Sequence, residues 1–346
     1  MWPLLLLACN LGSLTTIAGT PAPTGPPEGT LLGPDPALAL PAIEGDRYVL
    51  GTRVVHGTLA VWPILDAKPT TTGSYTLLAE GLAAGTVTVT EKDGGTVPNL
   101  TVTNKGGRPL FLAAGDVVTG GRQDRVIVAD LVINAGATES VAVNCVEHGR
   151  WSGGQTFGYG GKAEYALKET VEVDKDQGQT WAKVAELNGA KEQNLRAMGY
   201  HDSDLAPSTG TYRASMEAER VRERAIPYQA AAEQALTGDK VVGLVVALEG
   251  RVIGAELFGS PALLRQSRTA IARSVALDAV SRGTTPSTPP PDAEATAFLA
   301  DALRAKPAEA TATPVGTRVG TDGDQTHGYD LREADGDIVH KSSYRK

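Results

Sequence analysis

The chain of 346 residues has few cysteines, few aromatic residues and a deficit of basic residues. Cys9 and Cys145 are its two cysteines, aromatic residues make up 5%, and 32 Lys+Arg against 40 Asp+Glu give a net charge of −8. Nucleic-acid binding needs a basic surface, so an acidic chain predicts no nucleic-acid partner. Two cysteines exclude a fold held by several disulfides. The fold must rest on an apolar core, for which 41% hydrophobic residues suffice.

The sequence also lacks the patterns of a membrane span, a metal site or a nucleotide loop. No run approaches the roughly 20 apolar residues that a spanning helix needs. The histidines are scattered without the spacing of metal ligands: His56, His148, His201, His327 and His340. There is no Walker loop, no Gly-x-Gly-x-x-Gly after a strand and no Gly-x-Ser-x-Gly elbow. We therefore expect neither a resident metal nor a cofactor.

What is present begins with a segment that resembles a bacterial lipobox. A leucine run, Leu4–Leu7, leads through Ala8 to Cys9, whose thiol would be diacylated after removal of residues 1–8. The run is shorter than the roughly 7–15 apolar residues of a signal peptide and no Lys or Arg precedes it, so an unmodified Cys9 is the alternative. Two acyl chains give stable membrane anchoring.

Residues 10–44 have the composition of a tether. Seven prolines lie between Asn10 and Pro41, interleaved with Gly, Thr and Ala, and such a segment cannot bury enough apolar surface to fold. A lipid anchor followed by a tether predicts a protein of the bacterial cell envelope. Asn10 after the cysteine favours an outer-membrane lipoprotein that faces the periplasm or the surface.

Strand signals dominate from Tyr48 to Trp151. Thr86–Thr90 and Leu100–Asn104 alternate apolar and polar residues, as half-buried strands do. Short strands recur every 8–15 residues without a helix between them, which indicates an antiparallel sheet, sandwich-like or partly closed. The glycine-rich segment 152–161 that follows is predicted to be a mobile or ligand-hugging loop.

In the second half we expect helices that flank a β-hairpin. Helices are predicted over residues 180–197, 212–236, 260–281 and 293–304, and Pro227 should kink or break the second. Two β-branched runs around a short glycine-containing turn, residues 241–258, predict the hairpin. The fold class is α+β. A domain over residues 45–285 is followed by a proline-rich linker, a short helix and strands, residues 286–346, which we expect to pack on it.

Several blocks resemble a known family. Asn99–Asn104, Pro109–Asp116, Gly120–Val126 and Cys145–Trp151 are similar, in this order, to the ARPP domain, and Gly254–Gly259 is similar to its second half. The name refers to an association with ADP-ribosylglycohydrolases and rhodanese-phosphatase-superfamily proteins. The resemblance implies no reaction. The association hints at nucleotide- or ADP-ribose-like metabolites, but association does not define a site.

The first chemical cluster centres on Arg125. Gly120 and Gly121 allow a ligand to approach the backbone, and the Arg125 guanidinium could bind a phosphate or carboxylate through two donors. Gln123 and Arg125 share one side of a strand. The alternative is a structural turn in which Asp124 and Arg125 form an ion pair.

The second cluster extends over residues 145–151. Strand alternation puts Cys145 and Glu147 on the apolar side, where Glu147 needs a cation, either Arg125 or Arg150. A Cys145–His148 nucleophile is disfavoured because the two side chains would face opposite sides, so we expect Cys145 to be a buried structural thiol.

These residues support two hypotheses. In the first, the protein is an envelope lipoprotein whose ARPP-like domain is a binding or structural module. In the second, it is an enzyme or receptor for a small anionic metabolite, with Asp116 or Glu147 as general base and a polar pocket near residues 152–161. The ligand-binding candidates are Gly120, Gly121, Gln123, Arg125, Arg150 and Trp151.

Overall fold

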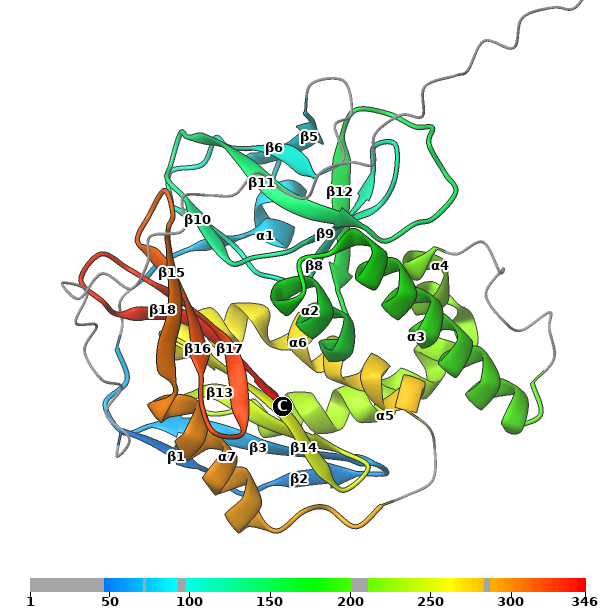
Figure 1. The fold of residues 1–346 in the computed structure, drawn as a ribbon, viewed down its shortest axis with the longest axis vertical. Helices are drawn as coiled ribbons and strands as arrows, with labels where there is room; N and C mark the ends of the chain where they lie inside the picture. The colour runs from blue at the N-terminus through cyan, green and yellow to red at the C-terminus, as the bar shows by residue number, and fades with distance from the viewer. Residues whose placement is uncertain (1–46, 71–72, 93–97, 201–210, 283–286) are drawn as a thin grey trace, which may run out of the picture.

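Figure 1 shows the fold in a computed structural model, which describes residues 47–70, 73–92, 98–200, 211–282 and 287–346. The predicted lipobox with Cys9 and the predicted tether lie outside these ranges. Within them the fold is α+β, with antiparallel sheets in a β-rich N-terminal half and most helices in the C-terminal half, as predicted.

The N-terminal half contains a six-stranded antiparallel sheet in the order β12-β8-β9-β11-β6-β5. Its strands are β5 (Val87–Glu91), β6 (Asn99–Asn104), β8 (Asp116–Gly120), β9 (Arg125–Ile127), β11 (Thr138–Cys145) and β12 (Phe157–Lys162). A bridge between Thr90 and Thr156 joins β5 to the start of β12, so the sheet partly closes into a barrel, one of the two predicted forms. Alternating side chains such as Val89, Leu100 and Val143 fill its interior.

A three-stranded sheet completes this half. It consists of β4 (Thr76–Leu77), β7 (Leu110–Leu112) and β10 (Leu131–Ile133), in the order β10-β7-β4. The short helix α1 (Leu78–Ala83) directly follows β4. Leu78, Leu110, Leu112 and Ile133 contribute to the same apolar core as the barrel strands.

The second large element is a nine-stranded antiparallel sheet in the order β1-β3-β13-β14-β18-β17-β16-β15, with β2 also paired to β3. Its strands are β1 (Tyr48–Leu50), β2 (Val54–His56), β3 (Leu59–Asp66), β13 (Val241–Leu248), β14 (Arg251–Phe258), β15 (Lys306–Ala312), β16 (Thr317–Asp322), β17 (Thr326–Arg332) and β18 (Ile338–Arg345). The sheet therefore joins segments from both ends of the described chain. The predicted hairpin over residues 241–258 is confirmed as β13 and β14.

Helices cover both faces of this sheet. On one face, α7 (Asp292–Arg304) packs Phe298 and Leu299 against a cluster that includes Trp62. On the other face lie α5 (Glu219–Ala235) and α6 (Pro261–Arg282), and Figure 1 shows α6 between the sheet and the barrel. The remaining helices are α2 (Tyr165–Val173), α3 (Gln177–Ala197) and α4 (Tyr212–Glu217).

The predicted helices are present, with three corrections to the predicted local structure. The segment from Tyr48 to Trp151 was expected to contain no helix, but α1 lies between β4 and β5. The helix predicted over residues 212–236 breaks at Ala218 and not at Pro227, which lies inside α5. Packing of α5 against α6 and β2 keeps it helical past the proline. The predicted glycine-rich loop is partly wrong, because its second half forms β12 paired with β8.

Candidate ligand-binding site

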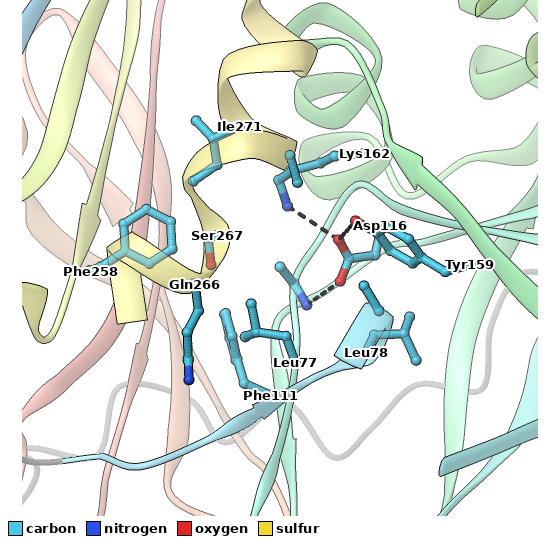
Figure 2. Close-up of a pocket in the computed structure, with 13 residues that line it drawn as sticks. Leu77, Leu78, Phe111, Asp116, Tyr159, Lys162, Phe258, Gln266, Ser267 and Ile271 are labelled. Atoms are coloured by element: carbon cyan, nitrogen blue, oxygen red, sulfur yellow. Dashed lines mark hydrogen bonds and ion pairs between the residues drawn. The ribbon is translucent and has the colours of Figure 1, made fainter. Parts of the chain in front are cut away.

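A partly enclosed cavity of about 60 Å³ lies where the barrel meets α6 and the end of β14 (Figure 2). Its walls are mostly apolar and include Leu77, Leu78, Phe111, Phe258, Ala270 and Ile271. Three polar groups, Asp116, Tyr159 and Lys162, converge on one side of it, and Figure 2 shows their polar atoms directed toward one another. An apolar cleft with a few convergent polar groups is the usual form of a small-molecule site.

A tight turn positions Asp116 at this cavity. Gly115, with a φ of +83°, connects β7 to β8, and a Cβ there would lie 3.0 Å from Lys168 Cγ. Asp116 opens β8, and its Oδ2 accepts a hydrogen bond of 3.1 Å from the Ala113 amide. The turn therefore holds the carboxylate by one oxygen.

A β-bulge brings Tyr159 and Lys162 to the same side. Residues three apart in a regular strand point to opposite faces, but the register between β12 and β8 shifts at Gly160. Tyr159 is then opposite Val118, and Lys162 is opposite Asp116. The extra residue must be small, because a Cβ on Gly160 would lie 2.4 Å from the Thr119 methyl group.

The second carboxylate oxygen of Asp116 has only distant partners. Its Oδ1 lies 3.4 Å from the Tyr159 hydroxyl and 3.6 Å from Lys162 Nζ, and both distances exceed those of a normal hydrogen bond. Lys162 donates at 3.1 Å to the Ala114 carbonyl oxygen. Burial raises the pKa of Asp116, and the positive charge of Lys162 offsets this only in part. Asp116 thus retains hydrogen-bonding capacity on the cavity side.

A buried ionic cluster lies behind the aromatic wall. The His340 ring packs between Phe111 and Phe258, with centroid distances of 5.8 and 4.5 Å. Its Nδ1 is 2.6 Å from Asp130 Oδ2, and its Nε2 is 3.5 Å from Glu256 Oε2. Asp130 follows barrel strand β9, whereas His340 and Glu256 belong to the large sheet, so the cluster joins the two halves.

The two predicted clusters of ionic residues do meet, at a different place from this cavity. Arg150 Nε donates to Glu147 Oε2 at 2.7 Å, and its Nη2 lies 3.1 Å from Asp124 Oδ1. Its Nη1 donates to the carbonyl oxygens of Gly121 and Ser152 at 3.0 and 2.8 Å. All three nitrogens are therefore engaged, and Arg150 holds the two loops together.

A groove of about 400 Å³ borders Arg150. It is lined by residues of both loops and of α4: Gly120, Asp124, Glu147, Arg150, Thr211, Arg213, Ala214 and Glu217. Burial alone would raise the pKa of Glu147, but hydrogen bonds from Arg150 and the Asp124 amide lower it below its usual value. Of the two predicted bases, Asp116 has a raised pKa and Glu147 a lowered one, and a raised pKa is the direction that favours a general base.

Arg125 does not reach this groove. The side chain is completely buried, and Nη1 donates to the Gln123 carbonyl oxygen at 2.9 Å, while Nε and Nη2 have no hydrogen-bond partner among the described residues. The predicted alternative of an Asp124–Arg125 ion pair is wrong, because Asp124 pairs with Arg150. The cation that Glu147 needs is Arg150, the second of the two predicted possibilities.

The other predicted residues have structural surroundings. A Cβ on Gly121, which has a φ of +51°, would overlap the Phe157 ring, and the Gln123 amide donates to the Glu147 carbonyl oxygen at 2.8 Å. Gly120 has a φ of +125° and starts the same turn. Trp151 is half exposed, with the Arg122 guanidinium 5.6 Å from its ring centroid.

The family follows from comparison with known proteins. Residues 47–344 match the family described as ARG and Rhodanese-Phosphatase-superfamily-associated Protein domain, ARPP-1. The chain belongs to this family. No curated protein and no solved structure matches it.

Cys145 of the ARPP-1 domain is buried, as predicted. Its backbone amide and carbonyl both bond the Gln177 side chain, at 2.7 and 2.9 Å, and burial raises the pKa of its thiol. His148 instead packs edge-on against Trp181 at 4.8 Å. A thiol with a raised pKa and no histidine partner is a poor nucleophile.

The sequence reasoning missed Tyr159, Lys162 and the buried ionic cluster. The segment around Tyr159 had been assigned to a loop, and only pairing with β8 reveals the bulge. Within the described ranges, no three His, Cys, Asp or Glu side chains are grouped as metal ligands, and none of the helices is long and apolar enough to cross a membrane.

Proposed function

We propose that this protein is an envelope lipoprotein whose ARPP-1 domain binds a small molecule in the cavity between the barrel and α6. The observation that carries the proposal is the buried Asp116 carboxylate, whose Oδ1 faces an apolar cavity with its nearest partners 3.4 and 3.6 Å away. A buried carboxylate costs free energy unless hydrogen bonds compensate it. A ligand that donates to Oδ1 would supply that compensation.

The position of the cavity supports binding. It lies between the barrel and α6, and junctions of structural units are common places for ligand sites. The elements that line it include β8, β12, α6 and β14, which pack on neighbouring strands and helices, so the polar groups are held before a ligand arrives.

A filling substitution tests the site. We expect Ala270→Leu on α6 to abolish the binding of small fragments that ligand-observed NMR detects with the full chain, because Ala270 lines the cavity. Ala262→Leu is the matched control: it is the same change on the same helix at an exposed position outside the lining. Equal fragment binding by both variants, or none by the unmodified chain, would contradict the proposal.

The membrane anchor is tested separately. Metabolic labelling with a fatty acid in a bacterial host should label the unmodified chain and leave Cys9→Ser unlabelled, because acylation requires the thiol. Label that persists in Cys9→Ser would refute the lipobox.

The alternative proposal is an enzyme or receptor for a small anionic, nucleotide- or ADP-ribose-like metabolite. It is favoured by Arg213, which lies in the groove beside Arg150 and whose Nε donates to Glu217 Oε2 at 3.2 Å. Thermal-shift measurements with nucleotides, ADP-ribose and sugar phosphates test it. Specific binding must raise the melting temperature, so no shift at millimolar ligand would exclude it.

A further inference from the structure

The polar side of the cavity presents an acceptor and a donor next to each other. Asp116 Oδ1 and Lys162 Nζ are 3.6 Å apart, and both side chains are buried, with exposed fractions of 8% and 5%. Lys162 has three N–H donors, of which one serves the Ala114 carbonyl oxygen at 3.1 Å. A donor on Lys162 and a lone pair on Asp116 therefore remain for a third group.

We infer that the cavity binds a primary carboxamide on a small branched apolar body, an inference that rests on the proposed binding function. The amide N–H would donate to Asp116 Oδ1, and the amide carbonyl oxygen would accept from Lys162 Nζ. The apolar body would contact Phe111, Phe258 and Ile271 (Figure 2).

Carboxylate, ammonium, ketone and hydrocarbon groups each satisfy at most one of the two residues. A carboxylate would accept from Lys162 but be repelled by Asp116. An ammonium group would donate to Asp116 but be repelled by Lys162. A ketone accepts from Lys162 but offers Asp116 no donor. A hydrocarbon would displace water from both charges and replace none of its hydrogen bonds.

The cavity limits the size of the body. A volume of about 60 Å³ is smaller than the roughly 150 Å³ cavity that encloses a benzene ring. A branched aliphatic group of three carbons is therefore a better probe than an aromatic ring.

Four probes that share an isopropyl group test the head group. Isobutyramide, isobutyrate, isobutylammonium and 3-methyl-2-butanone are titrated against the full chain by ligand-observed NMR. We expect isobutyramide to bind at least tenfold more tightly than the other three, and Ala270→Leu but not Ala262→Leu to abolish its binding.

Substitutions that change the charge give a second readout. Asp116→Asn should raise the affinity for isobutyrate relative to isobutyramide at least tenfold, because the repulsion is removed. Lys162→Met should likewise raise the affinity for isobutylammonium relative to isobutyramide at least tenfold. If Lys162→Met unfolds at a lower temperature, the comparison is made on Asp116→Asn alone. Asp116→Asn keeps an oxygen that accepts from the Ala113 amide.

The outcomes separate the two proposals. If all four probes bind equally and Ala270→Leu excludes them, the carboxamide inference is overturned while the binding site stands. If none binds, both are overturned. If isobutyramide is preferred but neither charge substitution shifts the preference, recognition does not involve Asp116 and Lys162, and the inference is again overturned.

Discussion

Asp116 is buried and only partly compensated, as expected of a residue that is retained for ligand binding although it lowers the stability of the fold. Burial raises the pKa of its carboxyl group, and Lys162 compensates only in part. A carboxyl group with a raised pKa in the folded state binds more protons folded than unfolded, so the free energy of unfolding falls as pH rises from about 4 through the folded-state pKa.

The neutral isostere should therefore be more stable. We expect Asp116→Asn to raise the free energy of unfolding by about 1 kcal/mol at pH 8, and by less at pH 4.5, where the native carboxyl is more protonated. Urea unfolding at the two pH values measures this. A destabilised Asp116→Asn at pH 8 would show that the carboxylate contributes to the fold itself.

Arg125 leads to a second prediction at this scale. Its guanidinium cannot lose its charge, and within the part of the chain that the structure describes two of its buried nitrogens have no hydrogen-bond partner. Replacement of poorly compensated buried charges by apolar side chains of similar size is often neutral or stabilising. We expect Arg125→Met to leave the free energy of unfolding unchanged or raise it by about 1 kcal/mol.

An ion pair of Arg125 with Asp124 or Glu147, which the sequence allowed, would instead make Arg125→Met destabilising. Thermal and urea unfolding of Arg125→Met and of the unmodified chain distinguish the two outcomes. A loss of more than about 2 kcal/mol in the free energy of unfolding would mean that Arg125 has a stabilising partner.

Of the residues at the cavity, Asp116 was among the candidates from the sequence, and the ionic network around Arg150, which lies elsewhere, could be predicted from residue types. Arg150 contacts both Glu147 and the loop around Gly121. The Glu147–Arg150 contact follows from strand alternation, which buries Glu147, and from the need of a buried carboxylate for a cation. The contribution of Lys162 could not be predicted, because it depends on a single extra residue at Gly160 that reverses the side on which later side chains fall.

At the scale of elements, Arg150 holds two loops together. It bonds backbone oxygens of residues 120, 121 and 152 and two carboxylates, and Lys cannot reproduce this because it lacks the planar fork of donors. We expect Arg150→Lys to lower the free energy of unfolding by about 1–3 kcal/mol.

Limited proteolysis measures how far the two loops open locally when Arg150 is replaced. Cleavage in the segment 147–156 should accelerate in Arg150→Lys more than cleavage elsewhere, because opening of these loops no longer breaks the same bonds. Unchanged proteolysis in that segment would mean that other contacts hold the loops.

Strands such as β5 and β6 were predictable because their apolar and polar residues alternate regularly. Among the helices, α6 has a clear start signal: Ser260 caps it, and its hydroxyl accepts from the Leu263 amide at 3.2 Å. The short helix α1 carries too few residues for a period to emerge, and tertiary packing overrides the local effect of Pro227.

At the scale of the whole molecule, His340 connects the barrel to the large sheet. Burial alone would lower the pKa of His340, but the charge and hydrogen bond of Asp130 raise it above its usual value. A histidine with a raised folded-state pKa contributes stability that is fully present below about pH 6.5 and is lost as pH rises through the folded-state pKa.

We therefore expect His340→Gln to cost more stability at pH 6 than at pH 9. Glu256 and Lys168, which also surround the ring, remain in both proteins. His327→Gln is the control, since His327 pairs with Glu169 at a partly exposed position, where an ion pair contributes little to stability. A loss for His340→Gln that is the same at both pH values would show that the ring is neutral in the fold.

The order of strands in the large sheet constrains how the protein is made. β18 lies between β14 and β17, yet it follows every other strand of that sheet in the sequence (Figure 1). During synthesis the ribosome must therefore release β18 before the two parts of the sheet can join, and until then the edges of β14 and β17 stay open to pairing with other chains. A nascent chain that stalls before residue 338 would expose both edges and be prone to aggregate.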